Sequence, residues 1–216
     1  MQEKKFKIIL LGAQGSGKGT QAEFLVDKLG IPLISVGKLL RDEIAAKTEI
    51  GNQIEDYMKK GQLVPNSIAH ELAKQKLDKS ECKDGFVFDG FPRNRIQAKF
   101  LETITDITDV LEIYISDDEA VKRLSGRRTC AKCGDIYHLE FNPPKKEGVC
   151  DECGGELIIR DDDTEEAIRQ RLKIYHEETE EVVEYFKEKG ILKRVNGEQS
   201  IEKVKEEIFR GLGIEE

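Results

Sequence analysis

The stretch Gly12-Ala-Gln-Gly15-Ser-Gly17-Lys18 constrains the fold of this chain more than any other feature. It has the pattern G-x-x-x-x-G-K, follows the apolar run Phe6–Leu11 and precedes a helix with apolar residues on one face. This order predicts a phosphate-binding loop, because the glycines let backbone N–H groups point into one hollow at a helix N-terminus. Lys18 would add a full positive charge. Gly19 replaces the usual Ser or Thr, so the metal-holding hydroxyl would have to come from Thr20.

Short apolar runs alternate with helical patterns along the rest of the chain. A helical pattern fills 37–78, with breaks expected at Gly51 and at Gly61–Pro65, and another is expected to run from 165 to 189. The alternation predicts an α/β fold of three layers, in which helices cover both faces of a parallel five-stranded sheet. The expected strands are Phe6–Leu11, Pro32–Ser35, Phe86–Phe88, Val110–Ile115 and Leu192–Val195. The length of 216 residues suits one such domain with an insertion.

Charge and hydropathy exclude several classes of protein. The chain has 43 acidic and 35 basic residues, a net charge of −8, which argues against a general binder of nucleic acids or anionic membranes. We expect acidic runs such as 161–163 and 177–178 to form a solvated shell. The longest apolar run, Ile8–Leu11, is far shorter than the ~20 residues of a membrane-spanning helix. The first five residues lack the apolar core of a signal peptide, so we expect a cytoplasmic protein.

Four of the five cysteines form a C-x2-C-x16-C-x2-C pattern at Cys130, Cys133, Cys150 and Cys153. This spacing is typical of a tetrahedral structural zinc site, which would fold a segment poor in apolar residues. Iron in the same sulfur cage, disulfides and free thiols are the alternatives. Residues 127–164 hold six basic and nine acidic residues, and thiolates bound to zinc would add negative charge, so the segment makes a poor nucleic-acid surface. Cys82 is expected to be a buried small residue.

An aspartate and several arginines complete the candidate site. Asp89 ends a predicted strand, where an acid in a phosphate-loop fold lies near the magnesium of a bound nucleotide; the alternative is a turn-initiating Asp before Gly90. Arginine guanidinium groups match phosphate oxygens bidentately, although a solvated surface role is the plainer interpretation for any one of them. The arginines near segment ends are Arg41, Arg93, Arg123, Arg127, Arg128, Arg160 and Arg171.

Taken together, these motifs resemble those of the adenylate kinases, specifically the long form with a zinc-binding lid, over nearly the whole chain. The sequences that carry the resemblance are GAQGSGKGTQA (12–22), GQLVP (61–65), DGFPR (89–93) with Gln97, RLSGRR (123–128), Tyr137-His138, FNPP (141–144), Arg160-Asp-Asp162, Arg171 and Val195-Asn-Gly197. The resemblance implies reversible phosphoryl transfer from Mg·ATP to AMP, giving two ADP. It divides the chain into a core (1–34, 65–126 and 165–216), a nucleoside monophosphate-binding insertion (35–64) and a zinc-binding lid (127–164).

The resemblance also implies a role for each matching residue. The donor ATP would be held by Gly15, Ser16, Gly17, Lys18, Gly19, Thr20, Arg123, Arg127, Ile136, Tyr137 and Gln199. The acceptor AMP would be held by Val36, Arg41, Gln62, Leu63, Val64, Gly90, Phe91, Pro92, Arg93, Gln97, Arg160 and Arg171. Lys18, Arg93, Arg127, Arg160 and Arg171 would be catalytic, and Asp89 would orient water-bound magnesium. The nucleotides are the expected partners of a monomer that binds neither nucleic acid nor membrane, and His138 is expected to be structural.

One departure from the family pattern leaves alternatives open. The family has Thr-Gly-Asp where this chain has Val36-Gly37-Lys38, so a hydroxyl near the acceptor base is lost and an acid becomes a lysine. A kinase for UMP or CMP is therefore the first alternative. A phosphate-loop ATPase that binds nucleic acid through its zinc segment is a second, and a nucleotide sensor without activity is a third, which the intact Lys18, Asp89 and Arg93 disfavour.

Overall fold

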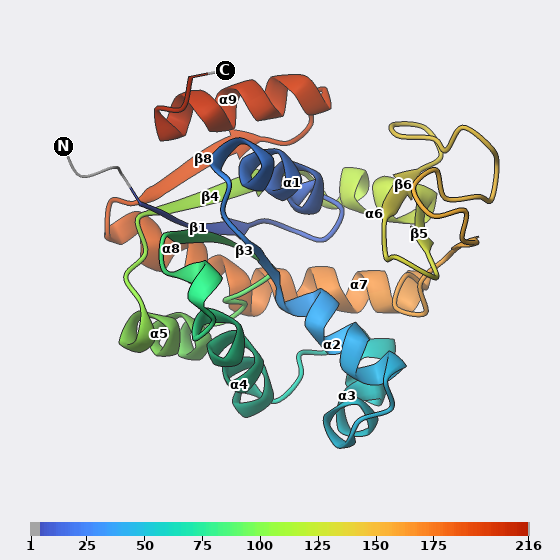
Figure 1. Ribbon diagram of the computed structural model, residues 1–216, viewed down its shortest axis with the longest axis horizontal. Helices are drawn as coiled ribbons and strands as arrows, with labels where there is room; N and C mark the ends of the chain where they lie inside the picture. Colours follow the sequence, from blue (N-terminus) through green and yellow to red (C-terminus); the bar gives the residue numbers. More distant parts are fainter. Residues whose placement is uncertain (1–4, 216) are drawn as a thin grey trace.

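The computed structural model describes residues 5–215, and within them the main sheet has five strands that all run parallel. The strand order is β2-β3-β1-β4-β8, which confirms the predicted α/β fold (Figure 1). The strands are β1 (Phe6–Leu11), β2 (Leu33–Ser35), β3 (Gly85–Asp89), β4 (Asp109–Tyr114) and β8 (Leu192–Asn196). The signal-peptide argument depends mostly on residues 1–4, and these lie outside the described residues.

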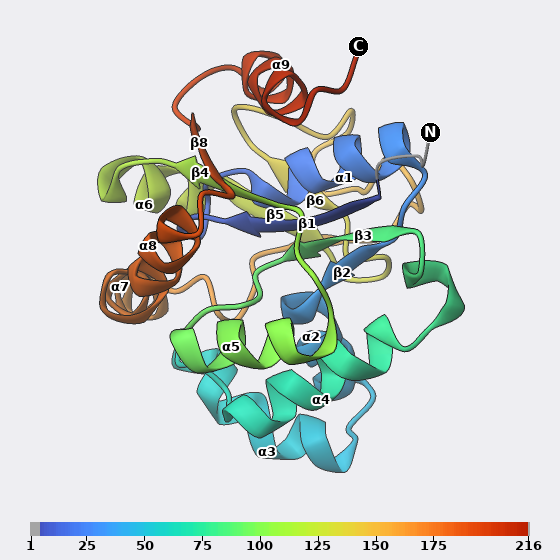
Figure 2. The same cartoon turned by 90° about the vertical axis from the view of Figure 1, so that its left-hand side faces the viewer.

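Side chains of the central strand β1 alternate between two apolar cores, one on each face of the sheet. Ile8 and Leu10 pack into the core shared with α1 (Lys18–Leu29) and α9 (Ile201–Leu212). Ile9 and Leu11 pack into the core shared with α5 (Arg95–Ile104) and α8 (Glu180–Glu188). Figure 2 shows the resulting layers, with α1 and α9 above the sheet and α3, α4 and α5 below it. A strand buried on both faces needs a continuous apolar run, and β1 has one.

The segment after β2 forms the helices α2 (Val36–Ala45), α3 (Glu49–Lys59) and α4 (Asn66–Leu77). The predicted break at Gly51 is wrong, because the chain turns at 46–48 and Gly51 lies inside α3. Thr48 caps α3 by accepting a hydrogen bond from the Gly51 N–H. Gly51 is instead a packing residue, since a Cβ there would lie 2.2 Å from the Glu43 carbonyl oxygen. The break at Gly61–Pro65 is confirmed. A short 3-10 helix, Ser80–Cys82, leads into β3, and Cys82 is buried as expected.

The cysteine-bearing segment is a small antiparallel sheet of order β6-β5-β7. It follows α6 (Asp117–Gly126) and contains β5 (Arg127–Cys130), β6 (Ile136–His138) and β7 (Leu157–Ile158). In Figure 1 it stands at one end of the main sheet, beyond α6. The small β-rich insertion is thereby confirmed, whereas the domain boundaries stay predictions.

The long helix predicted from 165 to 189 is divided into three parts. A π-helix, Tyr175–Thr179, separates α7 (Glu165–Ile174) from α8. Thr179 in this wide turn donates a hydrogen bond to the carbonyl oxygen of Arg93, at 2.8 Å. Such turns are rare and often lie at functional sites. Across residues 5–215, none of the helices is long and apolar enough to cross a membrane.

Candidate functional site

A cleft of ≈ 1730 Å³ opens at the carboxyl edge of the main sheet, between the phosphate-binding loop, α2–α3 and the cysteine-bearing sheet. Parallel sheets commonly bind ligands at this edge. The cleft brings together all the residues predicted to hold the donor nucleotide: Gly15, Ser16, Gly17, Lys18, Gly19, Thr20, Arg123, Arg127, Ile136, Tyr137 and Gln199. It also contains Arg41, Pro92, Arg160 and Arg171 from the predicted acceptor set.

The phosphate-binding loop has the conformation that its glycines predict. Gly12 has a φ of 139° and a Cβ there would lie 2.3 Å from the Ile113 carbonyl oxygen, so only glycine fits. The loop ends at Lys18, the first residue of α1, whose N-terminus faces the cleft. Lys18 Nζ donates to the carbonyl oxygens of Gly12 and Ala13, both at 2.7 Å. Burial, helped by the charges of Arg93, Arg127 and Arg171 and opposed by Asp89, lowers the pKa of Lys18 to about 8.

Oxygen atoms suited to a magnesium ion lie beside this loop. Asp89 is the last residue of β3 and lines the cleft, where it accepts a hydrogen bond from Ser35 Oγ at 3.3 Å. Ser16 and Thr20, which both carry hydroxyls, line the same cleft. Mg²⁺ prefers such oxygen donors and usually keeps several waters. The residues present therefore fit a nucleotide-bound magnesium ion.

A smaller pocket shares Gly37, Gln62, Gly90 and Arg93 with the cleft. It contains the remaining residues predicted for the acceptor: Val36, Leu63, Val64, Phe91 and Gln97. Most of its lining is apolar, and Gln97 is the buried polar residue in it, with 3% of its surface exposed. The pocket has a volume of only ≈ 20 Å³, far below the roughly 300 Å³ or more of a typical ligand pocket, so in this conformation it offers apolar walls and one polar edge but does not enclose a base.

Two guanidinium groups meet where the pocket joins the cleft. A Cβ on Gly37 would lie 3.6 Å from Arg41 Nη1 and 3.7 Å from Arg93 Nη2. Arg93 Nε donates to the Gly90 carbonyl oxygen at 2.9 Å. Burial first, and then the charge of Arg171, lower the pKa of Arg93, while burial also lowers the pKa of Arg41. Cations that are buried near one another in this way form a site for anions.

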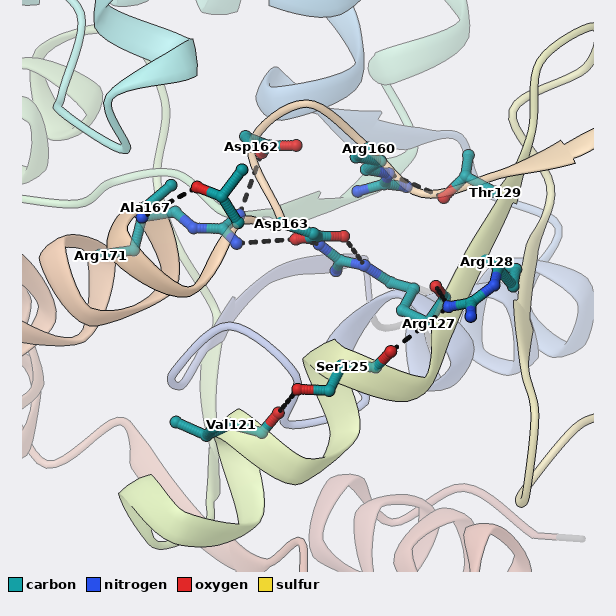
Figure 3. Close-up of polar contacts among 11 residues, drawn as sticks. Val121, Ser125, Arg127, Arg128, Thr129, Arg160, Asp162, Asp163, Ala167 and Arg171 are labelled. Atoms are coloured by element: carbon teal, nitrogen blue, oxygen red, sulfur yellow. Dashed lines mark hydrogen bonds and ion pairs between the residues drawn. The ribbon is translucent and has the colours of Figure 1, made fainter.

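The run Asp161–Asp163 was expected to be solvated, and for two of its three residues this is wrong. Asp162 and Asp163 are 9% and 8% exposed, because they bind arginines of the cleft (Figure 3). Asp163 accepts from Arg127 Nε at 2.8 Å and from Arg171 Nη2 at 2.7 Å. Asp162 accepts from Arg171 Nη1 at 3.0 Å. Sequence reasoning missed both as site residues, although the motif Arg160-Asp-Asp162 contained a signal.

Arg160 extends this cluster toward the lid strand β5. Its Nε donates to Thr129 Oγ1 at 2.8 Å, as Figure 3 shows. Burial, together with the charges of Arg127 and Arg41, lowers the pKa of Arg160 to about 9. The arginines predicted to be catalytic therefore come from the loop after β3, from β5, from the loop before α7 and from α7, and tertiary structure brings them to one cleft.

Residues of the lid and the nearby core hold their places through specific contacts. A Cβ on Gly19 would lie 3.8 Å from Ile136 Cδ1, so β6 reaches over the phosphate-binding loop. Tyr137 is buried, its backbone pairs with Arg128 of β5, and its hydroxyl accepts from the Asp151 N–H at 2.8 Å. Arg123 Nη2 donates to the Gly197 carbonyl oxygen at 2.9 Å. Gln199 donates to the Asn196 carbonyl oxygen at 3.0 Å.

The four clustered cysteines have the geometry of a metal site. Their sulfur atoms all lie within 4.8 Å of one another, with neighbours at 3.4–3.6 Å. A tetrahedral zinc site with bonds of about 2.3 Å separates its sulfurs by about 3.8 Å. Every cysteine is free in the described chain, which is inconsistent with the disulfide alternative. His138 is outside the cluster, and its Nδ1 accepts from the backbone N–H groups of Glu140 and Phe141; its structural role stays a prediction.

The sequence of this chain is similar to those of known adenylate kinases. The family described as adenylate kinase matches residues 10–191. An adenylate kinase of Caldicellulosiruptor saccharolyticus is 45% identical over 214 residues, which cover 97% of this chain and 100% of that protein. One of Thermodesulfovibrio yellowstonii is 46% identical over 203 residues (92% and 94%), and one of Archaeoglobus fulgidus is 44% identical over 206 residues (93% and 95%). The similarity therefore covers the loop, the arginine cluster and the four-cysteine segment.

Proposed function

Since the chain belongs to the adenylate kinase family, we propose that its cleft transfers the terminal phosphoryl group of ATP to AMP, giving two ADP. The observation that carries this proposal is the cluster of buried cations around the phosphate-binding loop. Lys18, Arg93 and Arg160 all have a lowered pKa, and burial is the largest cause in each case. Polyphosphate oxygens would neutralise these charges, so two phosphorylated ligands suit the cleft.

The donor phosphates would bind in the loop Gly15–Thr20. Backbone N–H groups at the start of α1 face the cleft there, and Lys18 adds a charge that can follow the transferring group. Magnesium held near Asp89 would neutralise charge on the phosphate oxygens. Arg123 and Arg127, with the backbone at Ile136 and Tyr137 and the loop at Gln199, would cover the donor nucleotide.

The acceptor would place its base against the smaller pocket, which would have to widen to enclose it, and its phosphate beside the arginines. Val36, Leu63, Val64 and Phe91 supply the apolar walls, and Gln97 supplies the polar edge. Arg41 and Arg93 meet at the mouth of this pocket, where an α-phosphate would lie. Arg160 and Arg171 would then contact the group in flight between the two nucleotides, together with Gln62, Gly90 and Pro92 as further lining.

The chemistry needs no general base. An AMP phosphate oxygen, already ionised at neutral pH, attacks the terminal phosphorus of ATP, and the bond from that phosphorus to the β-phosphate oxygen breaks. Catalysis then depends on alignment and on charge stabilisation by Lys18 and the arginines. Water is a competing acceptor, so the lid 127–164 would close over the phosphates, moving near 123–128 and 160–164. Zinc bound by the four cysteines would make that lid rigid.

An acceptor comparison tests this proposal. A coupled assay with ATP and either AMP, CMP, UMP or GMP should give the highest kcat/KM with AMP. CMP or UMP outpacing AMP would show that the Val36-Gly37-Lys38 departure changes the acceptor. ATP hydrolysis without any monophosphate, together with salt-sensitive nucleic-acid binding, would point to the ATPase alternative. We further propose that the protein is a cytoplasmic monomer. The net charge of −8 supports the absence of nucleic-acid and anionic-membrane partners.

A further inference from the structure

We infer that Asn66 fixes the orientation of the Gln97 side-chain amide and so makes the acceptor pocket select one class of base. This inference rests on the proposed function. Asn66 is the first residue of α4, and Gln97 lies in the first turn of α5, so the contact joins two helices that are far apart in sequence. Gln97 Nε2 donates to Asn66 Oδ1 at 2.9 Å.

Two backbone N–H groups determine which end of each amide is oxygen. The Arg93 N–H donates to the Gln97 side chain at 2.8 Å, and this partner must therefore be Oε1. The Gln97 N–H donates to the Asn94 side chain at 2.9 Å, and this partner must be Oδ1. Both amides consequently direct their NH2 groups at Asn66, whose Oδ1 accepts from Gln97 at 2.9 Å and from Asn94 at 3.0 Å. The polarity of the whole network is thereby determined.

A turned amide at Gln97 would lose both of its side-chain contacts, the one with the Arg93 N–H and the one with Asn66 Oδ1. Its NH2 would face the Arg93 N–H, and its oxygen would face Asn66 Oδ1, so a donor would meet a donor and an acceptor would meet an acceptor. Gln97 is 3% exposed, and water therefore cannot replace the lost hydrogen bonds. The Arg93 N–H opposes this rotation at the oxygen of the amide, and Asn66 Oδ1 opposes it at the NH2 group.

The orientation matters because purine bases differ in polarity at the edge that Gln97 faces. Adenine presents an acceptor ring nitrogen beside an amino donor, whereas hypoxanthine and guanine present a ring N–H donor beside a carbonyl acceptor. After its contacts with Arg93 and Asn66, the Gln97 amide still has one N–H and one oxygen lone pair for the pocket. A fixed donor and acceptor match only one of the two patterns, and an amide that can turn matches both. Buried polar groups left without partners make such discrimination strong.

The test compares AMP with inosine monophosphate (IMP), which differs from AMP at this edge alone. In Asn66→Leu, we expect the ratio of kcat/KM for IMP to that for AMP to rise about tenfold, because one of the two contacts that hold the amide is removed. Asn66→Asp keeps the acceptor oxygen and should keep the wild-type ratio. The KM for ATP should be unchanged in Asn66→Leu, since the donor site lies elsewhere. Asn52→Leu, on the exposed surface of α3, is the matched control.

The outcomes separate this inference from the proposed function. If the wild-type protein does not phosphorylate AMP, the proposed function is wrong. If it does, an unchanged ratio in Asn66→Leu overturns the inference, as does an equal change in Asn66→Asp. A rise in the KM for ATP as large as that for AMP would show a merely structural role and would also overturn it. Should Asn66→Leu fail to fold, Asn66→Ala removes the same amide acceptor with less bulk and has the same expected ratio.

Discussion

Asp163 bridges two arginines of the cleft, which makes Asp163→Asn a sharp test of how the cleft is stabilised. The Asp163 side chain is fully buried, and those of Arg127 and Arg171 are 15% and 8% exposed. Burial alone would raise the pKa of Asp163, but the charges of Arg127 and Arg171 outweigh it and lower the pKa below its ordinary value of 3.8. Asparagine keeps the shape and loses the charge, so it leaves two nearly buried cations less neutralised.

The magnitude follows from this burial. Removing one partner of a buried ion pair costs about 3–5 kcal/mol. Asparagine retains one acceptor oxygen and Arg171 retains Asp162, so we expect the lower end, about 3 kcal/mol. For a protein of this length, that loss lowers Tm by roughly 6–12 °C.

Thermal unfolding at neutral pH, with Asp161→Asn as the control, measures the effect. Asp161 is exposed, so its variant should unfold within about 1 °C of the wild type. Because the folded-state pKa of Asp163 is lowered, its stabilisation is fully present above about pH 4 and is lost as the pH falls through the lower folded value. The wild type and Asp163→Asn should therefore converge in acid. Equal Tm values for the two aspartate variants at pH 7 would refute the reasoning.

Three other predictions concern the lid, the phosphate-binding loop and two helical glycines. Removing zinc with a chelator should raise amide hydrogen exchange in 127–158 and lower activity, while the strands of the main sheet stay protected; unchanged exchange in the lid would contradict this. The kcat/KM for ATP should fall as the pH rises through about 8, because Lys18 then loses the proton that gives it charge, and a flat profile from pH 7 to 9 would exclude that role. Gly51→Ala should cost about 1–3 kcal/mol in urea denaturation, since its Cβ would meet the Glu43 carbonyl oxygen at 2.2 Å. In Gly211→Ala, in α9, the added Cβ would meet only Lys193 Cδ, at 3.5 Å, so the free energy of unfolding should rise by about 0.5 kcal/mol. If the free energy of unfolding changed in the same direction in both variants, the packing explanation would be wrong.

Short sequence patterns predicted the elements that depend on residues close to one another in the chain. The strand Phe6–Leu11 was predicted with its observed bounds, since a strand buried on both faces needs a continuous apolar run. The phosphate-binding loop was predicted because its glycines and Lys18 are consecutive in the chain. The cysteine site likewise follows from spacing, because each pair of ligands lies within one tight turn.

Features that depend on distant partners could not be predicted in this way. The break at 46–48 depends on how closely α3 packs on α2, and the π-helix coincides with a contact from Thr179 to Arg93. An acidic run on its own is typical of a solvated surface, and Asp163 is buried because Arg171 and Arg127, which is 36 positions away, both donate hydrogen bonds to it.

The sequence by itself therefore determined the α/β fold, the phosphate-binding loop, the four-cysteine site and the family, because each is carried by residues that are close in the chain or match a known pattern. Only the tertiary structure decided which charges neutralise one another in the cleft and which way the Gln97 amide points. The physical reason is that ion pairs and hydrogen bonds depend on distances between atoms, and folding brings Asn66 and Gln97, 31 positions apart, to 2.9 Å.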